Sequence, residues 1–360
     1  MELYFKGKQT KEEIIQEAKG FGMFESFTNG SFVYEGDNFE GLSKLYNTKK
    51  GFLDLVYIDP PFNTNQVFSV TDTRVSTVSR AKKGNVAYVD LMKNDDFLAF
   101  MYKRFVLIYE LLSEKGSLYV HINSKMGYYF KVMLDEIFGE DNFKNDITRV
   151  KSNPKNFDRK AFGNQKDMIL FYSRSSSKNI WNDVRADYVE DDLKKRFSKI
   201  DENGRRYTTI PLHAPGESNG VTGKSWRGMM PPQGRHWRTD PAKFDKMDEQ
   251  GLIEWSSNGN PRIKKFADEN KGKKIQDIWE FKDPQYPVYP TEKSIDLLSL
   301  IVKQSSNEGG YVLDCFAGSG TTLLASASQK RNFIGMDKSS FAIDVIKKRL
   351  SEYEYTIINK

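Results

Sequence analysis

The sequence contains one cysteine and only three histidines among its 360 residues. A single thiol, Cys315, cannot supply a disulfide framework or a cysteine-based zinc site, so a disulfide-stapled secreted scaffold is excluded. Three histidines leave little material for a metal centre, and we expect no metal. No apolar run approaches the roughly 20 residues of a membrane span, and the N-terminal stretch lacks a signal-peptide core. These absences predict a soluble cytoplasmic protein that does not enter a membrane.

The chain is rich in aromatic residues, and its charge is distributed unevenly along the sequence. It carries 25 Phe, 18 Tyr and 5 Trp, too many for a disordered chain, and its length allows one large or two medium domains. The formal charge is +6, but residues 149–282 hold 28 Lys and Arg against 19 Asp and Glu. This basic middle third favours a polyanion partner such as nucleic acid, with an ordinary solvated surface as the alternative.

Two basic segments, 151–164 and 224–238, mix cationic, aromatic and amide side chains with glycine and proline. Lysine and arginine in such segments can hold phosphates, while amides and aromatic faces contact bases. Alternatively, these arginines hold only phosphates or pack the domain. The candidate DNA-binding residues are Lys151, Lys155, Arg159, Arg227, Arg235 and Arg238.

Strand and helix patterns alternate at both ends of the chain. FLDLVYID (52–59) is typical of a strand buried on both faces of a parallel sheet, because it is apolar and stops at two prolines. The alternation predicts an α/β sheet with crossover helices, a long loop at 63–94, and an inserted irregular domain from about 180 to 288. Further strands are predicted at 31–34, 116–123, 167–174, 311–316 and 332–337, and helices at 11–19, 97–116, 127–139, 292–306, 320–329 and 339–352.

A glycine-rich turn joins a predicted strand to a helix within YVLDCFAGSGTTLLASASQKRNFIGMD. Gly318 and Gly320 let the backbone pass close to a ligand, and Asp337 can bind ribose hydroxyls at the end of the next strand. No lysine follows GSGTT, which excludes a P-loop, and the third glycine of a dinucleotide fingerprint is missing. Adenosylmethionine fits better, since Asp314 suits its cationic groups; an ordinary tight turn is the alternative.

A second turn, Asp59-Pro60-Pro61-Phe62, follows the apolar strand at the edge where open α/β sheets bind ligands. Prolines have no N–H donor, so carbonyl oxygens stay free as acceptors. Asp59 and the Pro60 carbonyl can accept the two hydrogens of an aminated nucleobase while Phe62 stacks on its ring. The alternative is a helix-start turn with a buried phenylalanine.

These two motifs, Asp59-Pro60-Pro61-Phe62 and, far downstream, Phe316-Ala317-Gly318-Ser319-Gly320, together resemble the amino-methylating DNA methyltransferases. Their order resembles the β class of that family. The segments 116–143 and NPKNF to DMILFYSR look most like adenine-specific modification subunits of type III restriction-modification systems. The likeness spans roughly residues 31–350, although such subunits are usually longer and carry tyrosine where this chain has Phe62.

The resemblance implies a Rossmann-like, doubly wound α/β methyltransferase sheet, circularly permuted with the catalytic half first, and an inserted target-recognition domain. Residues 1–178 would form the catalytic half, 179–288 the target-recognition region and 289–360 the S-adenosylmethionine-binding half. The implied catalytic residues are Asp59, Pro60, Pro61 and Phe62. The implied cofactor-binding residues are Asp37, Thr291, Lys293, Asp314, Phe316, Ala317, Gly318, Gly320 and Asp337.

The activity that the resemblance implies is site-specific methylation of the adenine amino group in double-stranded DNA, by base flipping and direct in-line transfer. Asp59 favours adenine, because similar enzymes acting on cytosine more often carry serine there. A restriction subunit and a second copy of the chain are further expected partners. The alternatives are a cytosine amino-methyltransferase, a non-catalytic DNA-specificity subunit and a nicotinamide oxidoreductase. A nucleophilic Cys315 is disfavoured, since it lies within the expected cofactor turn.

Overall fold

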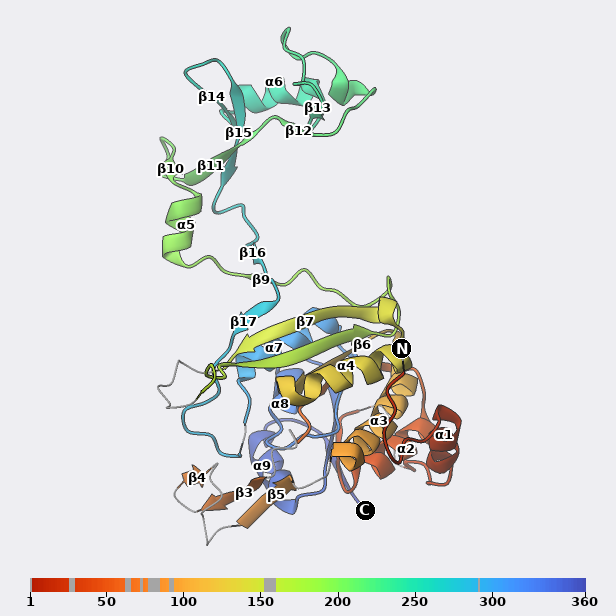
Figure 1. Cartoon of the computed structure of the whole chain (residues 1–360). Helices are drawn as coiled ribbons and strands as arrows, with labels where there is room; N and C mark the ends of the chain where they lie inside the picture. Colours follow the sequence, from red (N-terminus) through yellow and green to blue (C-terminus); the bar gives the residue numbers. More distant parts are fainter. Residues whose placement is uncertain are drawn as a thin grey trace. The chain divides into compact units, whose positions relative to one another are not determined.

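The structure is a computed structural model that describes residues 2–25, 30–61, 66–71, 74–76, 85–90, 94–151, 160–290 and 292–360. The chain divides into two compact units (Figure 1). Unit 1 comprises Met1–Val184 and Gln276–Lys360, and unit 2 comprises Arg185–Ile275. Unit 2 falls inside the span 179–288, and the chain leaves unit 1 and returns to it.

Unit 1 is built on a nine-stranded sheet of order β17-β7-β8-β6-β2-β18-β19-β1-β20. Every neighbouring pair is parallel except those of β8, which runs antiparallel to both β6 and β7. The strands are β1 (Phe32–Glu35), β2 (Leu53–Ile58), β6 (Leu112–Ile122), β7 (Phe143–Val150), β8 (Lys166–Ser173), β17 (Ile278–Glu280), β18 (Tyr311–Asp314), β19 (Asn332–Asp337) and β20 (Thr356–Asn359).

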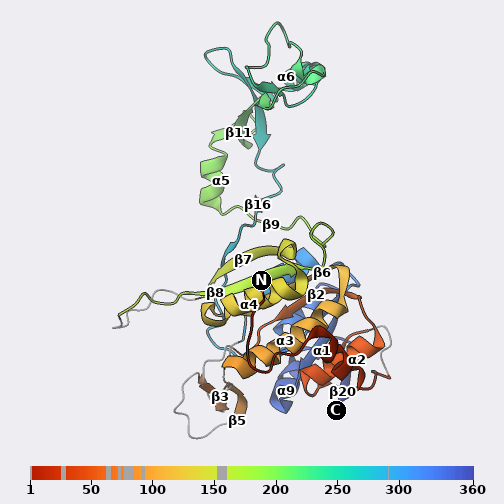
Figure 2. The ribbon, with the colours of Figure 1, turned by 45° about the vertical axis from the view of Figure 1, so that its right-hand side comes forward.

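Helices cover both faces of this sheet (Figure 2). One layer packs on the large core and consists of α1 (Lys11–Lys19), α2 (Asn38–Thr48), α3 (Asn94–Leu111) and α4 (Ser124–Phe138). The other layer consists of α7 (Ile295–Ser305), α8 (Thr321–Ser328) and α9 (Ser340–Arg349). The doubly wound α/β fold class predicted from the sequence is therefore confirmed. Within the described residues, no helix has the length and apolarity to span a membrane.

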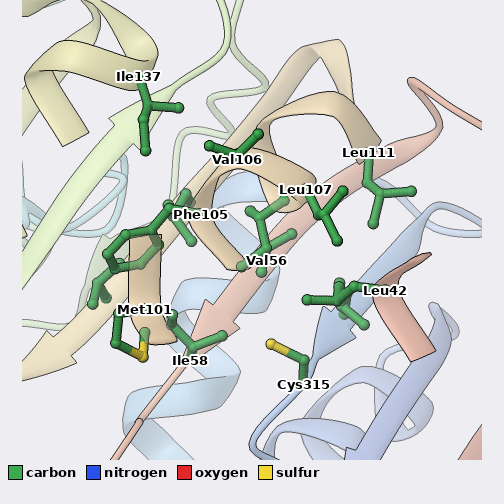
Figure 3. Close-up of a cluster of buried hydrophobic side chains, with 14 of the residues drawn as sticks. Leu42, Val56, Ile58, Met101, Phe105, Val106, Leu107, Leu111, Ile137 and Cys315 are labelled. Carbon is green, nitrogen blue, oxygen red and sulfur yellow. The ribbon is translucent and has the colours of Figure 1, made fainter. Parts of the chain in front are cut away.

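The large core forms because β2 alternates its side chains between the two faces of the sheet. Val56 and Ile58 point toward α3, where they meet Met101 and Phe105 (Figure 3). Cys315 is 1% exposed in the same cluster, and burial raises the pKa of its thiol well above the usual value. A thiol held neutral in an apolar core is a poor nucleophile, which argues against cysteine chemistry.

Two expectations about this unit were wrong. The predicted helix 97–116 ends at Leu111, and β6 begins at once. Gly116 does not terminate a helix; it lies inside β6, where a Cβ atom would come within 2.5 Å of the Leu53 carbonyl oxygen of β2. Only glycine fits between the two strands there.

The span 63–94, predicted to be a loop, contains a three-stranded antiparallel sheet of order β4-β3-β5. Its strands are β3 (Gln66–Thr71), β4 (Arg74–Ser76) and β5 (Asn85–Asp90). QVFSVT and NVAYVD are rich in valine and aromatic residues, which favour strands. This composition is the strand signal that the high polarity of the whole span concealed.

Unit 2 has its own small core. A four-stranded sheet of order β10-β11-β15-β14 packs with a hairpin, β12-β13, around buried Trp226, Trp237 and Phe244. The elements are β9 (Arg185–Ala186), α5 (Glu190–Arg196), β10 (Lys199–Ile200), β11 (Arg206–Pro211), β12 (His213–Pro215), β13 (Arg235–Trp237), α6 (Pro241–Glu249), β14 (Ile253–Trp255), β15 (Pro261–Phe266) and β16 (Lys273–Lys274). The unit is thus a packed domain and not only a series of loops.

Candidate active site

Four acidic residues follow or end four adjacent strands of unit 1. The central strands lie in the order β2-β18-β19-β1 and are parallel, so their carboxyl ends share one edge. Asp59 follows β2, Asp314 ends β18, Asp337 ends β19 and Asp37 follows β1. The fold therefore places two motifs that are about 250 residues apart in the sequence on neighbouring strand ends, at the edge where open α/β sheets bind ligands.

The carboxylate of Asp59 has two unlike oxygens. Oδ2 forms an ion pair with the ammonium of Lys293, and the two side chains are 16% and 10% exposed. Oδ1 is buried and, among the described residues, accepts no hydrogen bond. A buried oxygen without a donor costs about 1–3 kcal/mol, so Oδ1 is an acceptor that a bound N–H group would satisfy.

The rest of the catalytic motif is only partly described. Pro60 is buried and Pro61 half-buried, whereas Phe62 lies outside the described residues. Lys293 was expected at the cofactor, and its ammonium contacts the carboxylate of Asp59. Thr291, from the same segment, also lies outside the described residues.

The glycine-rich turn requires glycine for two separate reasons. Gly318 and Gly320 have φ angles of +48° and +73°, in the left-handed region. A Cβ atom on Gly320 would lie 2.8 Å from Cγ1 of Ile346, and one on Gly318 would lie 3.3 Å from the ring of Tyr289. The turn leads directly into α8, whose N-terminal N–H groups face the same edge.

Two carboxylates hold this turn in shape. Asp314 is 3% exposed and accepts hydrogen bonds from the Thr322 hydroxyl at 2.6 Å and the Phe316 N–H at 3.0 Å. Asp337 accepts from the N–H groups of Gly318 and Ser339, each at 2.9 Å. Each carboxylate oxygen that accepts one bond keeps a further lone pair for a ligand.

Burial favours the neutral form of the Asp314 and Asp337 carboxyl groups. It raises the pKa of Asp314 to about 7, and the charges of Asp59 and Asp337 act in the same direction. Burial also raises the pKa of Asp337. A strand edge that carries two such buried carboxyl groups favours a cationic ligand.

The remaining expected cofactor residues have identifiable neighbours. Asp37 caps α2, because its Oδ1 accepts from the N–H of Phe39 at 2.8 Å. Ala317 is buried, and its N–H donates to the carbonyl of Met336 at 3.1 Å. The half-buried ring of Phe316 lies 6.2 Å from that of Phe100 on α3.

A buried polar chain that the sequence did not indicate runs beneath Asp59. The Tyr57 hydroxyl and His121 Nδ1 are 2.9 Å apart, and His121 Nε2 lies 3.5 Å from Asp167. Burial lowers the pKa of His121, so the imidazole is neutral. Lys151, expected at DNA, donates to Asp167 at 2.7 Å. No sequence signal linked these residues, because they come from separate strands.

The other expected DNA-binding residues differ in how they are held. Arg227 binds Asp245 at 2.8 Å and Asp248 at 2.6 Å, both on α6, and so braces unit 2. Arg235 and Arg238 are exposed and have no carboxylate partner within the described part of the chain. Lys155 and Arg159 lie outside the described residues.

A carboxylate-proline-proline turn next to a glycine-rich turn on a doubly wound sheet defines a Rossmann-like methyltransferase. A family model described as "DNA methylase" matches residues 53–348, and the chain belongs to this family of N6 and N4 amino-methyltransferases. This confirms the resemblance identified from the sequence. The family uses S-adenosylmethionine, which confirms the expected cofactor.

Two relatives by sequence have names that agree with the family. The chain is 38% identical to the type II methyltransferase M.EcaI of Enterobacter cloacae over 92% of its length and 73% of that enzyme. It is 24% identical to the StyLTI Mod subunit of a type III restriction-modification enzyme from Salmonella typhimurium, covering 88% of this chain and 52% of the subunit. The crystal structure of the M1.HpyAVI–SAM complex aligns with 88% of this chain and 98% of its own at 19% identity, with a TM-score of 0.45.

Proposed function

We propose that this protein methylates the exocyclic amino group of adenine at a specific site in double-stranded DNA, in the cytoplasm, as part of a restriction-modification system. The observation that carries the proposal is the buried Oδ1 of Asp59, which has no hydrogen-bond donor within the described part of the chain and lies at the strand end next to the glycine-rich turn. An amino group has two hydrogens to donate, and Asp59 and the Pro60 carbonyl supply two acceptors.

In a duplex the amino group is inside the base stack, so the base must be flipped out at a cost of a few kcal/mol. Phe62 is proposed to stack on the flipped ring, which returns about 1–3 kcal/mol. The lone pair of the amino nitrogen is delocalised into the ring. Hydrogen bonds to Asp59 and Pro60 favour a pyramidal nitrogen whose lone pair points at the methyl group.

Transfer is then direct and in line, so positioning and electrostatics dominate. The methylated nitrogen must lose one proton, and Asp59, which already accepts that hydrogen, is placed to take it. Lys293 stays on the other oxygen and keeps the carboxylate oriented. No covalent enzyme intermediate is required.

The residues around the glycine-rich turn fit S-adenosylmethionine, which supplies the methyl group when bound. Gly318 and Gly320 adopt the positive φ angles of a tight turn, which lets backbone N–H groups at the start of α8 be presented to a ligand. Asp337 is proposed to bind ribose hydroxyls, and Asp314 to face the cationic end. Asp37, Phe316, Ala317, Thr291 and Lys293 remain proposed members of this site.

We assign target recognition to the segment 179–288, which contains unit 2, and the two halves of the methyltransferase to 1–178 and 289–360. Arg235 and Arg238 are the proposed DNA contacts of unit 2, because no described carboxylate competes for them. Arg227 is already held by two aspartates and has a supporting role. The relationship to M.EcaI and the StyLTI Mod subunit supports a restriction enzyme as functional partner.

The test is methyl transfer to DNA from labelled cofactor, followed by mass spectrometry of the nucleosides. We expect N6-methyladenosine in its deoxy form as the product. Labelled N4-methylcytosine instead would replace the adenine assignment by the cytosine one. An absence of transfer, with cofactor binding intact, would favour a non-catalytic specificity subunit.

A further inference from the structure

Arg104, on α3, is a buried cation that the proposed reaction does not use. It is 4% exposed, and burial lowers the pKa of its guanidinium to about 10. The one carboxylate paired with it among the described residues is that of Asp37, 3.5 Å away and itself half exposed. Taking a charge out of water costs several kcal/mol unless hydrogen bonds compensate for it. The hydrogen bonds of the Arg104 guanidinium therefore indicate its role.

The guanidinium is fixed in both position and orientation. Nε donates to Oδ1 of Asn38 at 2.6 Å, and Nη1 donates to the carbonyl of Phe100 at 2.8 Å. The group also lies over the ring of Phe100, with its central carbon 3.3 Å from the ring centre. Only the forked, planar guanidinium can make these contacts together.

Asn38 connects the guanidinium of Arg104 to the glycine-rich turn. Its Nδ2 donates to the carbonyl oxygen of Cys315 at 2.7 Å. Cys315 lies between Asp314 and Phe316, where the chain leaves β18. Because Arg104 can only donate, it fixes the oxygen of the Asn38 amide toward itself and the NH₂ group toward Cys315. Without that donor, the amide could rotate and place its oxygen against the Cys315 carbonyl.

We propose that Arg104 is a positioning residue for the cofactor: through Asn38 it fixes the Cys315 carbonyl, and it holds the second oxygen of Asp37. The inference rests on cofactor binding at the glycine-rich turn and is independent of which base is methylated. Helix α3 contacts the glycine-rich turn at a second point, where the ring of Phe100 lies beside that of Phe316. Arg104 thus links α3 to both strand ends that flank β19.

The test measures S-adenosylmethionine binding by calorimetry without DNA. Arg104→Met keeps much of the side-chain volume and removes every donor, and we expect at least a tenfold weaker Kd. Arg104→Lys keeps the charge but cannot make both hydrogen bonds, so it should fall between wild type and Arg104→Met. Duplex DNA binding should change by less than twofold in both variants.

Tyr102→Phe is the matched control on the same helix. Tyr102 is 2% exposed, and its hydroxyl donates to Glu136 at 2.6 Å, away from the turn. The variant should lower the melting temperature and leave the cofactor Kd unchanged. If Tyr102→Phe weakens cofactor binding as much as Arg104→Met does, Arg104 merely supports the fold and the inference fails.

A double-mutant cycle with Asn38→Ala tests the series of hydrogen bonds from Arg104 through Asn38 to Cys315. Asn38→Ala alone should weaken cofactor binding, and adding Arg104→Met should cost less than Arg104→Met costs alone, because both act through Cys315 and only the contact with Asp37 is lost in addition. Fully additive losses would show that the two residues act independently and would overturn the inference. If Arg104→Met does not fold, the Lys variant enters the cycle in its place. Wild-type cofactor binding without adenine methylation would refute only the proposed function.

Discussion

The two oxygens of Asp59 have separate tasks. Lys293 holds Oδ2, and the buried Oδ1 faces the position proposed for the target amino group. We predict that Asp59→Ala reduces methyl transfer to less than a tenth of wild type while the protein stays folded and still binds cofactor. Single-turnover assays with circular dichroism would check this. Turnover above that level would remove Asp59 from the proposed role.

Asp314 should make cofactor binding depend on pH. Its pKa is raised to about 7 in the free protein, and a cationic ligand nearby favours the ionised form. Binding should therefore release a proton, and affinity should rise with pH up to about 7 and then level off. Calorimetry in two buffers of different ionisation enthalpy measures the released proton. Asp314→Asn should bind more weakly at high pH and show a flat profile through this range.

The same raised pKa has the opposite effect on stability. Between the unfolded value near 4 and the folded value near 7, the native state holds the proton more strongly than the unfolded state. The contribution of Asp314 to the free energy of unfolding should thus fall as pH rises through this window. Denaturant titrations of wild type and Asp314→Asn across these pH values would test it. An Asp314 contribution that grows with pH would contradict the raised pKa.

Sequence reasoning found residues whose role depends on local context. Asp59 and the glycine-rich turn could be recognised because each follows directly after an apolar strand. Arg104 and His121 could not, because their partners lie far away in the sequence: Arg104 depends on Asn38 and His121 on Asp167. Nothing near either residue in the sequence distinguishes it from an ordinary helix or strand position.

At the scale of elements, the turn between β18 and α8 depends on Gly320. Gly309 is a suitable control, since its φ of +77° resembles the +73° of Gly320 but no atom lies within 4 Å of the position that a Cβ would take there. Gly309→Ala should cost only the backbone strain of about 1–2 kcal/mol. Gly320→Ala should cost more, because its Cβ would meet Ile346. Equal losses in urea unfolding would show that the close contact relaxes freely.

Elements with strong periodicity were predicted well, and those set by tertiary contacts were not. The helix Lys11–Lys19 and the strand Asn332–Asp337 have the predicted bounds. The reversal of β8, the early start of β6 and the pairing of β17 with β7 depend on neighbouring strands, which a local pattern does not contain. The sheet β4-β3-β5 was missed because its short, valine-rich strands lie in a polar span.

At the scale of the whole molecule, the chain separates positive charge from the carboxylate-rich edge of unit 1. Residues 149–282 carry the excess of Lys and Arg, whereas the rest of the chain has 27 of them against 30 acidic residues. An acidic edge suits a cationic cofactor, and a basic middle segment suits a polyanion. The charge pattern thus assigns the two proposed ligands to different parts of the sequence.

This division predicts different outcomes for three arginines of unit 2. Arg227→Ala breaks two ion pairs with α6, so it should lower the stability of unit 2. Arg235→Ala and Arg238→Ala should leave stability nearly unchanged and weaken DNA binding. An arginine that reads a base should lose about 1–3 kcal/mol of discrimination at one position, whereas one that holds a phosphate should weaken all sequences equally and reduce the salt dependence.

The measurement is the set of methylated positions in a random DNA library, together with DNA affinity at several salt concentrations. Nη1 of Arg235 lies 3.3 Å from Nδ1 of His213. Burial and the charges of Arg235, Arg238 and Arg262 lower the pKa of His213, so the imidazole is neutral. An anion placed among these side chains would relieve their mutual repulsion, which is the physical reason to expect DNA here. If both variants keep the wild-type sequence preference and salt slope, this hairpin does not contact DNA.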